Sequence, residues 1–370
     1  MSHFTVLVIG EDVDRQLAPF HEFECTGRDD EYVQTIDKTE EAREEYLKDT
    51  ERMYVSESGE IVDAYDDRFY RDPTEKESKQ IGIGGTGCCR DFGFTSKDWG
   101  DGKGYRPKVH FLPEGFEEKQ IPTPEVKDFA EFVQDYYGME IIGKAKKPDL
   151  GKKHKYGWCR VDKDGKVIEV IRRTNPNDHW DWYQVGGRWS GLFQMKDNRK
   201  GKVGETAFMC DPAKPGTSDQ ALKGDIDFER MRAESLKEKM DKYDKAVSII
   251  AGRSFVSWDR VKEENGQDIN RSREIYGEQQ VIKDFQHEFF FDDIENYCVA
   301  REEYLEKASK SSGFSTFAVI KDSKWYEKGR MGWWAMVHDE KDEDEWCCKF
   351  NELIDSVPDD TLLTIVDCHI

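Results

Sequence analysis

A chain of 370 residues, of which 36% are hydrophobic, 12% aromatic and 36% charged, is long enough to bury a sizeable core and too aromatic to be disordered. Its formal net charge of −22 disfavours nucleic acid and anionic membranes as direct partners, because both carry negative charge themselves. The sequence has no long apolar run and no signal-peptide pattern at its N-terminus, so we expect a cytoplasmic protein without a membrane span.

The cysteines point to a reducing compartment. There are nine of them, an odd number, and no two are spaced as Cys-x-x-Cys. The two adjacent Cys-Cys pairs suit neither a disulfide framework nor a zinc knuckle. We therefore expect reduced thiols, with no metal and no cofactor.

The predicted elements begin with a strand over residues 3–9, which is apolar and β-branched. Residues 26–142 are acidic and contain glycines, which indicates an insertion or subdomain. Its first part, 26–80, is dense in Asp, Glu and Tyr and is expected to be a mobile or inserted segment, whose order without a partner stays open. Within it, Thr123-Pro124 predicts a helix start with threonine as the cap. The basic, non-periodic stretch 143–155 predicts a loop, which could receive a phosphate.

A β-rich aromatic section is expected over residues 156–224. It opens with a predicted hairpin, in which strands over 156–161 and 166–171 flank an Asp-Gly turn. Two long helical patterns follow, over 225–251 and 273–310, each with a single apolar stripe.

The last part of the chain predicts two strands, over 314–321 and 325–337, and a helix over 346–357. The final strand, 361–368, is apolar at nearly every position, which is typical of a strand covered on both faces. The strand over 3–9 has the same character, so we expect both terminal strands in one sheet.

The expected fold class is therefore α+β. A mostly antiparallel sheet would contain the N- and C-terminal strands, helices would pack on it, and the middle of the chain would be β-rich. Residues 1–25 and 225–370 would form this core domain.

One glycine-rich motif resembles a nucleotide-binding loop. The segment from Gly82 to Gly87 has the spacing G-x-G-x-x-G. However, a charged segment precedes it instead of a buried strand, and no helix start follows it. We therefore assign it no nucleotide.

The densest group of chemically active side chains lies between Asn175 and Gly191. The candidate ligand-binding residues are Trp180, Trp182, Tyr183, Arg188 and Trp189. Tryptophans beside a guanidinium suit a planar or anionic ligand. His179 and Asp181 are the candidate base and its orienting group, and we expect Asp181 to hold Arg188 as well. The alternative is an aromatic core patch with a bulge and a structural Arg–Asp pair.

A second candidate site joins the two ends of the chain. His3 begins the first strand, and Asp367, Cys368 and His369 end the last one. If the two strands are antiparallel neighbours, these termini meet, and a Cys–His contact becomes conceivable.

Three segments resemble a family of uncharacterised proteins of bacteriophages and prophages. These are the opening MSHFTVLVIG with the nearby HEFECTG, the central WDWYQVGGRWSG, and MGWW with the closing LLTIVDCHI. The resemblance carries no catalytic residue with it. What it implies is an accessory protein that acts inside an infected bacterium, where blocking host defence is a common task.

The distribution of charge suggests how such a protein would act. Residues 1–80 carry 23 acids and 10 bases, and residues 339–370 carry 11 acids and 2 bases. Acidic ends brought together by the terminal strands would suit an inhibitor that binds a host protein with a basic surface. The alternative is a protein that binds a nucleotide or small anion through the segment from Trp180 to Trp189, as a sponge or a hydrolase. Whether the chain is an enzyme stays open, with binding favoured.

Overall fold

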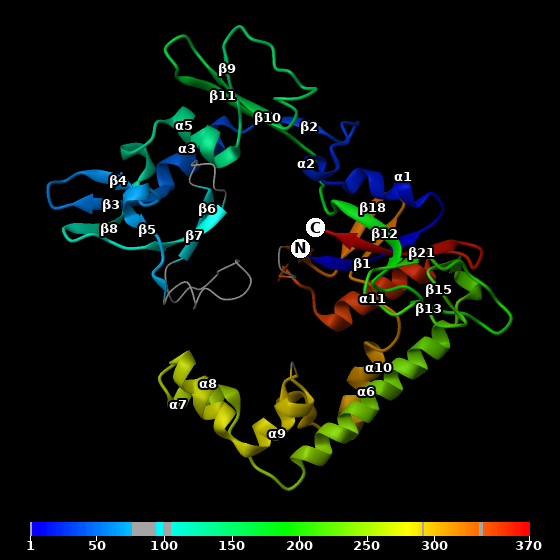
Figure 1. Ribbon diagram of the computed structural model, residues 1–370. Coiled ribbons are helices and arrows are strands. Elements are labelled where there is room, and N and C mark those ends of the chain that lie inside the picture. The colour runs from blue at the N-terminus through cyan, green and yellow to red at the C-terminus, as the bar shows by residue number, and fades with distance from the viewer. Residues whose placement is uncertain (1, 76–93, 99–104, 291, 333–335) are drawn as a thin grey trace. The chain divides into compact units, whose positions relative to one another are not determined.

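The structure is a computed structural model that describes residues 2–75, 94–98, 105–290, 292–332 and 336–370. The chain divides into two compact units (Figure 1). We name them the terminal unit, residues 1–32 with 175–370, and the middle unit, residues 33–174. The sequence-based division differs, because it groups 156–174 with the aromatic segment. In the structure that hairpin pairs with strands of the middle unit instead.

The terminal unit is built on a seven-stranded sheet of order β14-β12-β21-β1-β17-β18, with β16 paired to β21. Its strands are β1 (His3–Ile9), β12 (Trp182–Gly187), β14 (Glu205–Thr206), β16 (Gln220–Leu222), β17 (Ala318–Lys321), β18 (Lys324–Glu327) and β21 (Leu362–His369). Four pairings are antiparallel, while β1–β17 and β12–β14 are parallel. The predicted α+β class is confirmed, with both terminal strands in one sheet, although the sheet is mixed.

Burial on both faces explains the apolar terminal strands. On one face, Leu7 of β1 and Ile365 of β21 pack with Phe350 of helix α11 (Glu343–Asp355). On the other face, Val6 and Val366 pack in a second core. Figure 1 shows β1 and β21 side by side, with the N- and C-termini at the same end of the sheet.

The remaining elements of the terminal unit are short strands and helices. The strands are β13 (Phe193–Gln194), β15 (Thr217–Ser218), β19 (Arg330–Met331) and β20 (Val337–His338). The helices are α1 (Val13–Leu17), η1 (Ala18–Phe20), α2 (Phe23–Thr26), η5 (Lys223–Asp225), α6 (Phe228–Ile250), α7 (Trp258–Glu264), α8 (Ile269–Glu278), α9 (Gln280–Glu288), η6 (Ile294–Tyr297) and α10 (Arg301–Lys310). The helix expected over 273–310 is broken, because Gln279 adopts an extended backbone and starts a new helix.

Among its described residues, the middle unit contains three small sheets. The first has β2 (Gln34–Asp37), β11 (Val167–Thr174), β10 (Gly157–Val161) and β9 (Ile141–Gly143); the second has β4 (Ile61–Asp63), β3 (Thr50–Ser56) and β8 (Phe116–Pro122); the third has β5 (Tyr70–Arg71), β7 (Tyr105–His110) and β6 (Phe94–Asp98). Its helices are α3 (Thr39–Lys48), η2 (Asp67–Phe69), η4 (Thr123–Glu125) and α5 (Phe129–Tyr137). The expected threonine cap is wrong, because α5 is capped by Asp128.

Among the described residues, no helix combines the length and apolar character needed to cross a membrane.

Candidate functional site

Three of the five candidate ligand-binding residues pack against the cores of the terminal unit. Trp180 is 2% exposed, and its indole N–H donates to the Leu17 carbonyl oxygen at 3.0 Å. Tyr183 packs in the same core, and its hydroxyl donates to Asp14. Trp189 is half-buried against the opposite core. For these residues the structure matches the alternative of an aromatic core patch.

Two buried carboxylates shape the end of β12 and the loop after it, residues 186–191, which we name the double-glycine loop. Gly187 has a φ of +58°, and a Cβ there would lie 2.3 Å from the Cβ of Asp367. The backbone N–H of Arg188 donates to Asp367 Oδ2 at 3.0 Å. Asp219 accepts from Ser190 Oγ and from the N–H groups of Gly191 and Gly204. The glycines are therefore needed for close approach to carboxylates, and not for a ligand.

The expected pair between Arg188 and Asp181 is wrong. The Arg188 side chain is exposed, whereas Asp181 bonds His369. The reason is local, because the loop fixes Arg188 through its backbone N–H.

Two histidine–carboxylate pairs lie next to each other where β1 begins and β21 ends. His3 Nδ1 lies 2.9 Å from Asp367 Oδ1, and His369 Nδ1 lies 2.6 Å from Asp181 Oδ1. The two imidazole ring centroids are 4.9 Å apart. The Asp367 side chain is fully buried, while those of His3 and Asp181 are 12% and 17% exposed. We name these four residues the paired-histidine cluster.

The strand register produces this cluster. His3 pairs with His369 across the antiparallel β1–β21 ladder, and Asp367 lies two residues before His369 on the same face. The pairing of β12 with β21 places Trp182 opposite His369. The predicted meeting of the chain ends is therefore present, but Cys368 points into the opposite core and makes no site with His3. Burial also raises the pKa of the Cys368 thiol well above its ordinary value.

Trp182 forms an exposed aromatic wall beside the cluster. Its ring is stacked on His369 at 5.5 Å with an interplanar angle of 19°, and it meets His3 edge-on. The residue is 42% exposed, so part of its surface is accessible to a ligand. The Nε2 atoms of both histidines have no hydrogen-bond partner among the described residues. The cluster thus presents two ring nitrogens beside an aromatic surface.

A third group of reactive side chains adjoins Asp181. Glu22 occupies the N-cap position of helix α2, and Cys25 lies one turn further. Their ligand atoms lie within 4.8 Å of each other and of an Asp181 oxygen. Burial raises the pKa of Glu22, and the charges of Asp178, Glu24 and Asp181 add to this effect. Desolvation of the Cys25 sulfur, followed by its contact with Glu22, raises the pKa of that thiol to about 11, although the residue as a whole is exposed.

The sequence interpretation missed Glu22 and Cys25. Their i, i+3 spacing within HEFEC would place both on one helical face, which was the available signal. The four-residue helix that realises this spacing has no apolar periodicity to reveal it.

Among the described residues, no hydrogen bond or ion pair joins His179 and Asp181, so the two form no base–orienter pair. Its Nδ1 lies 2.7 Å from the Asn177 carbonyl oxygen, and its ring packs 4.5 Å from Trp325. With Phe20 and Trp325 it lines an open cavity of about 1010 Å³. His179 is therefore part of a separate aromatic surface.

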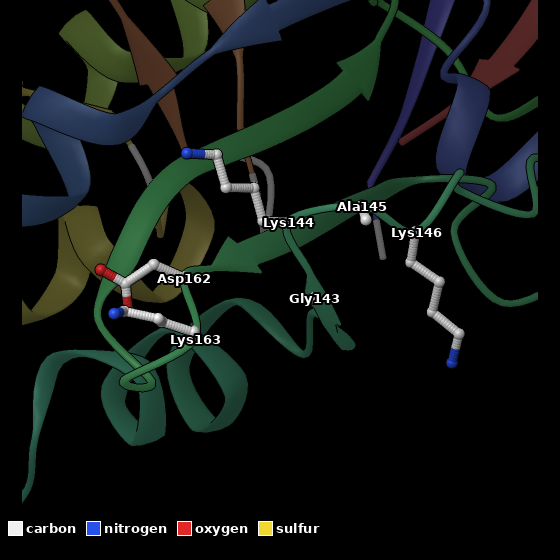
Figure 2. Close-up of a pocket in the computed structure, with 6 residues that line it drawn as sticks. All are labelled: Gly143, Lys144, Ala145, Lys146, Asp162 and Lys163. Carbon is white, nitrogen blue, oxygen red and sulfur yellow. The ribbon is translucent and has the colours of Figure 1, made fainter.

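The basic stretch of the middle unit does form a loop, which borders a shallow cavity of about 730 Å³. Arg160 holds this loop, because its guanidinium donates to the carbonyl oxygens of Gly143, Lys144 and Lys146. Figure 2 shows the Lys144 and Lys146 side chains extending in different directions. A phosphate clamp requires side chains that converge on one point, and these two do not. The segment from Gly82 to Gly87 lies outside the described residues.

No family model matches the chain, and comparisons with curated proteins and with solved structures also find no match. The case for a site therefore depends on its geometry. Segments that lie far apart in the sequence, around His3, Glu22, Asp181 and Asp367, converge at one end of one sheet.

Proposed function

We propose that the terminal unit is an enzyme that hydrolyses a small planar anion by acid–base catalysis at the paired-histidine cluster. The observation that carries this proposal is the adjacency of two histidine–carboxylate pairs, His3 with Asp367 and His369 with Asp181. A single buried pair is common in protein cores. Two pairs that share one sheet end, with an exposed tryptophan stacked on them, suit chemistry better than packing.

The carboxylates determine which ring nitrogens would act. A carboxylate at Nδ1 favours a proton on that atom, which leaves Nε2 as the basic nitrogen of the neutral ring. One Nε2 would remove a proton from water, and the other ring, in its protonated form, would deliver a proton to the leaving group. Water adds across the broken bond, so atoms and protons balance.

The surroundings suggest the class of substrate. The accessible surface of Trp182 would stack a planar group, and the exposed guanidinium of Arg188 would attract an anionic one. Both residues belong to the aromatic segment that the sequence interpretation assigned to a nucleotide or small anion. The hydrolase form of that alternative is the function we favour, and we place its action in the cytoplasm, that of the host for a phage-encoded protein.

The test is a search for turnover in a bacterial small-molecule extract, analysed by mass spectrometry before and after incubation. We expect the native protein to deplete a compound and to form a product heavier by one water. His369→Asn should lose this conversion, whereas His287→Asn, the same change at an exposed position of helix α9, should retain it. An extract that the native protein leaves unchanged, or equal conversion by His369→Asn, contradicts the proposal.

A second candidate function is the inhibitor of a host protein with a basic surface. It is favoured by the segment 339–345, in which six of seven residues are acidic and most are exposed. The acidic N-terminal part supports it less, because residues 1–32 hold only eight of the 23 acids and the rest belong to the middle unit. A salt-sensitive complex with a host protein, lost when 339–345 is neutralised, would support this function. The absence of such a complex would contradict this function.

A further inference from the structure

We infer that Glu22, Cys25 and Asp181 bind a divalent transition metal of the zinc class, next to the paired-histidine cluster. One thiol and two carboxylates from two distant segments of the chain present their ligand atoms to a common point. The site deepens the proposed function, because it would supply that function with a metal ion, but its existence can be tested by itself.

The distances fit a small cation. The sulfur and the two carboxylate oxygens lie within 4.8 Å of one another, so a point exists no farther than about 2.8 Å from all three. Zinc bonds to sulfur are about 2.3 Å and to carboxylate oxygen about 2.0–2.2 Å. Side-chain rotations that move each ligand atom by at most about 0.5–0.8 Å close this difference.

Backbone hydrogen bonds hold the three residues in place. The Glu22 N–H donates to the Trp180 carbonyl oxygen at 2.6 Å, which fastens the start of α2 beside Asp181. The Asp181 N–H donates to the His369 carbonyl oxygen at 2.9 Å. These bonds use no side-chain atom. The Cys25 thiol contacts Glu22, so a metal bound between them would replace the thiol proton.

His369 orients one of the ligands. Its Nδ1 binds Asp181 Oδ1 at 2.6 Å, which fixes the carboxylate and leaves Oδ2 for the metal. Outer hydrogen bonds of this kind commonly position metal ligands. The paired-histidine cluster and the metal site therefore share Asp181, which lies between them.

Donor chemistry and charge select the ion. A thiolate favours zinc, cobalt or iron over magnesium and calcium, while carboxylates accept all of them. Three protein ligands leave a coordination position for water, as in catalytic zinc sites. The neighbouring charges of Glu24 and Asp178 add to the negative field around Glu22, and this field attracts a cation.

The experiment is a titration of the metal-free full chain with Co²⁺, followed by absorption spectroscopy and then by competition with Zn²⁺. We expect a thiolate-to-cobalt charge-transfer band that Zn²⁺ removes. Cys25→Ser should lose the band, while Cys348→Ser, which alters another exposed cysteine, should keep it. Asp181→Asn should weaken Co²⁺ binding about tenfold or more, and Glu24→Gln should change it far less.

Two results would overturn the inference: no charge-transfer band in the native protein, or an equal band in Cys25→Ser. Near-ultraviolet circular dichroism of each variant confirms that it is folded before the spectra are compared. The readout is independent of turnover. A missing band with intact turnover removes the metal site alone, and a band without turnover removes the proposed function alone.

Discussion

Asp219 and Asp367 are both fully buried carboxylates that hold the double-glycine loop, yet their partners differ. Asp219 accepts from three groups, Ser190, Gly191 and Gly204, all of them neutral donors of neighbouring loops. Asp367 accepts from the Arg188 N–H and from a histidine that leads to the exposed end of the sheet. Burial alone therefore does not identify a functional carboxylate. We propose a functional role for Asp367 and not for Asp219 because their partners differ.

The largest effect is expected from a substitution of Asp219. Asp219→Ala should lower the free energy of unfolding by about 3 kcal/mol, because three half-buried donors lose their acceptor. Urea denaturation followed by circular dichroism measures this change. A loss below about 1 kcal/mol would show that the loop does not depend on this carboxylate.

Asp367→Asn should lower the free energy of unfolding less than Asp219→Ala does, but should strongly reduce the proposed activity. The amide oxygen can still accept from the Arg188 N–H, so we expect a loss of about 1 kcal/mol. The charge opposite His3 is gone, so conversion in the extract assay should fall by at least tenfold. Urea denaturation and the extract assay are both needed for this variant. Unchanged conversion would show that Asp367, like Asp219, is a purely structural residue.

Glu22 should make the metal-free protein slightly less stable as pH rises. Burial raises its pKa in the folded state, so the folded chain holds this proton more tightly than the unfolded chain. The resulting stability is fully present below the ordinary value of 4.5 and is lost as pH rises through the raised value. Glu22→Gln should remove this dependence and slightly stabilise the metal-free protein at pH 7. Unfolding curves of the native protein and of Glu22→Gln at several pH values test the sign of this dependence. A stability that rises with pH in the native protein but not in the variant would contradict the prediction.

The smallest expected effect concerns Arg188. Its side chain is exposed and the loop uses only its backbone, so Arg188→Ala should change the free energy of unfolding by less than about 0.5 kcal/mol. The same variant should weaken conversion of an anionic substrate. Thermal denaturation and the extract assay measure these two effects. A loss of several kcal/mol in the free energy of unfolding would support the structural Arg–Asp pair expected from the sequence.

Much of the fold could be predicted, because burial leaves a strong pattern. Strands covered on both faces are apolar throughout, which identified β1 and β21 and their common sheet. The broken helix over 273–310 could not be foreseen, since its apolar stripe continues across Gln279, where the backbone turns.

The site could be predicted only in part. Antiparallel terminal strands bring His3 to the last residues of the chain, and this was expected. Which of Asp367, Cys368 and His369 it meets depends on the register, because neighbouring residues of a strand face opposite sides. The partner of Asp181 depends on the pairing of β12 with β21, which no local pattern specifies.

The central claim is that carboxylates hold both imidazoles by Nδ1 and leave Nε2 free for chemistry. Long-range proton–nitrogen NMR of the ring nitrogens tests it without a substrate, with the signals assigned through His3→Gln and His369→Gln. We predict that the neutral forms of both rings carry their proton on Nδ1. Rings protonated on Nε2 instead would contradict the account, because the proposed catalytic atoms would not be bases.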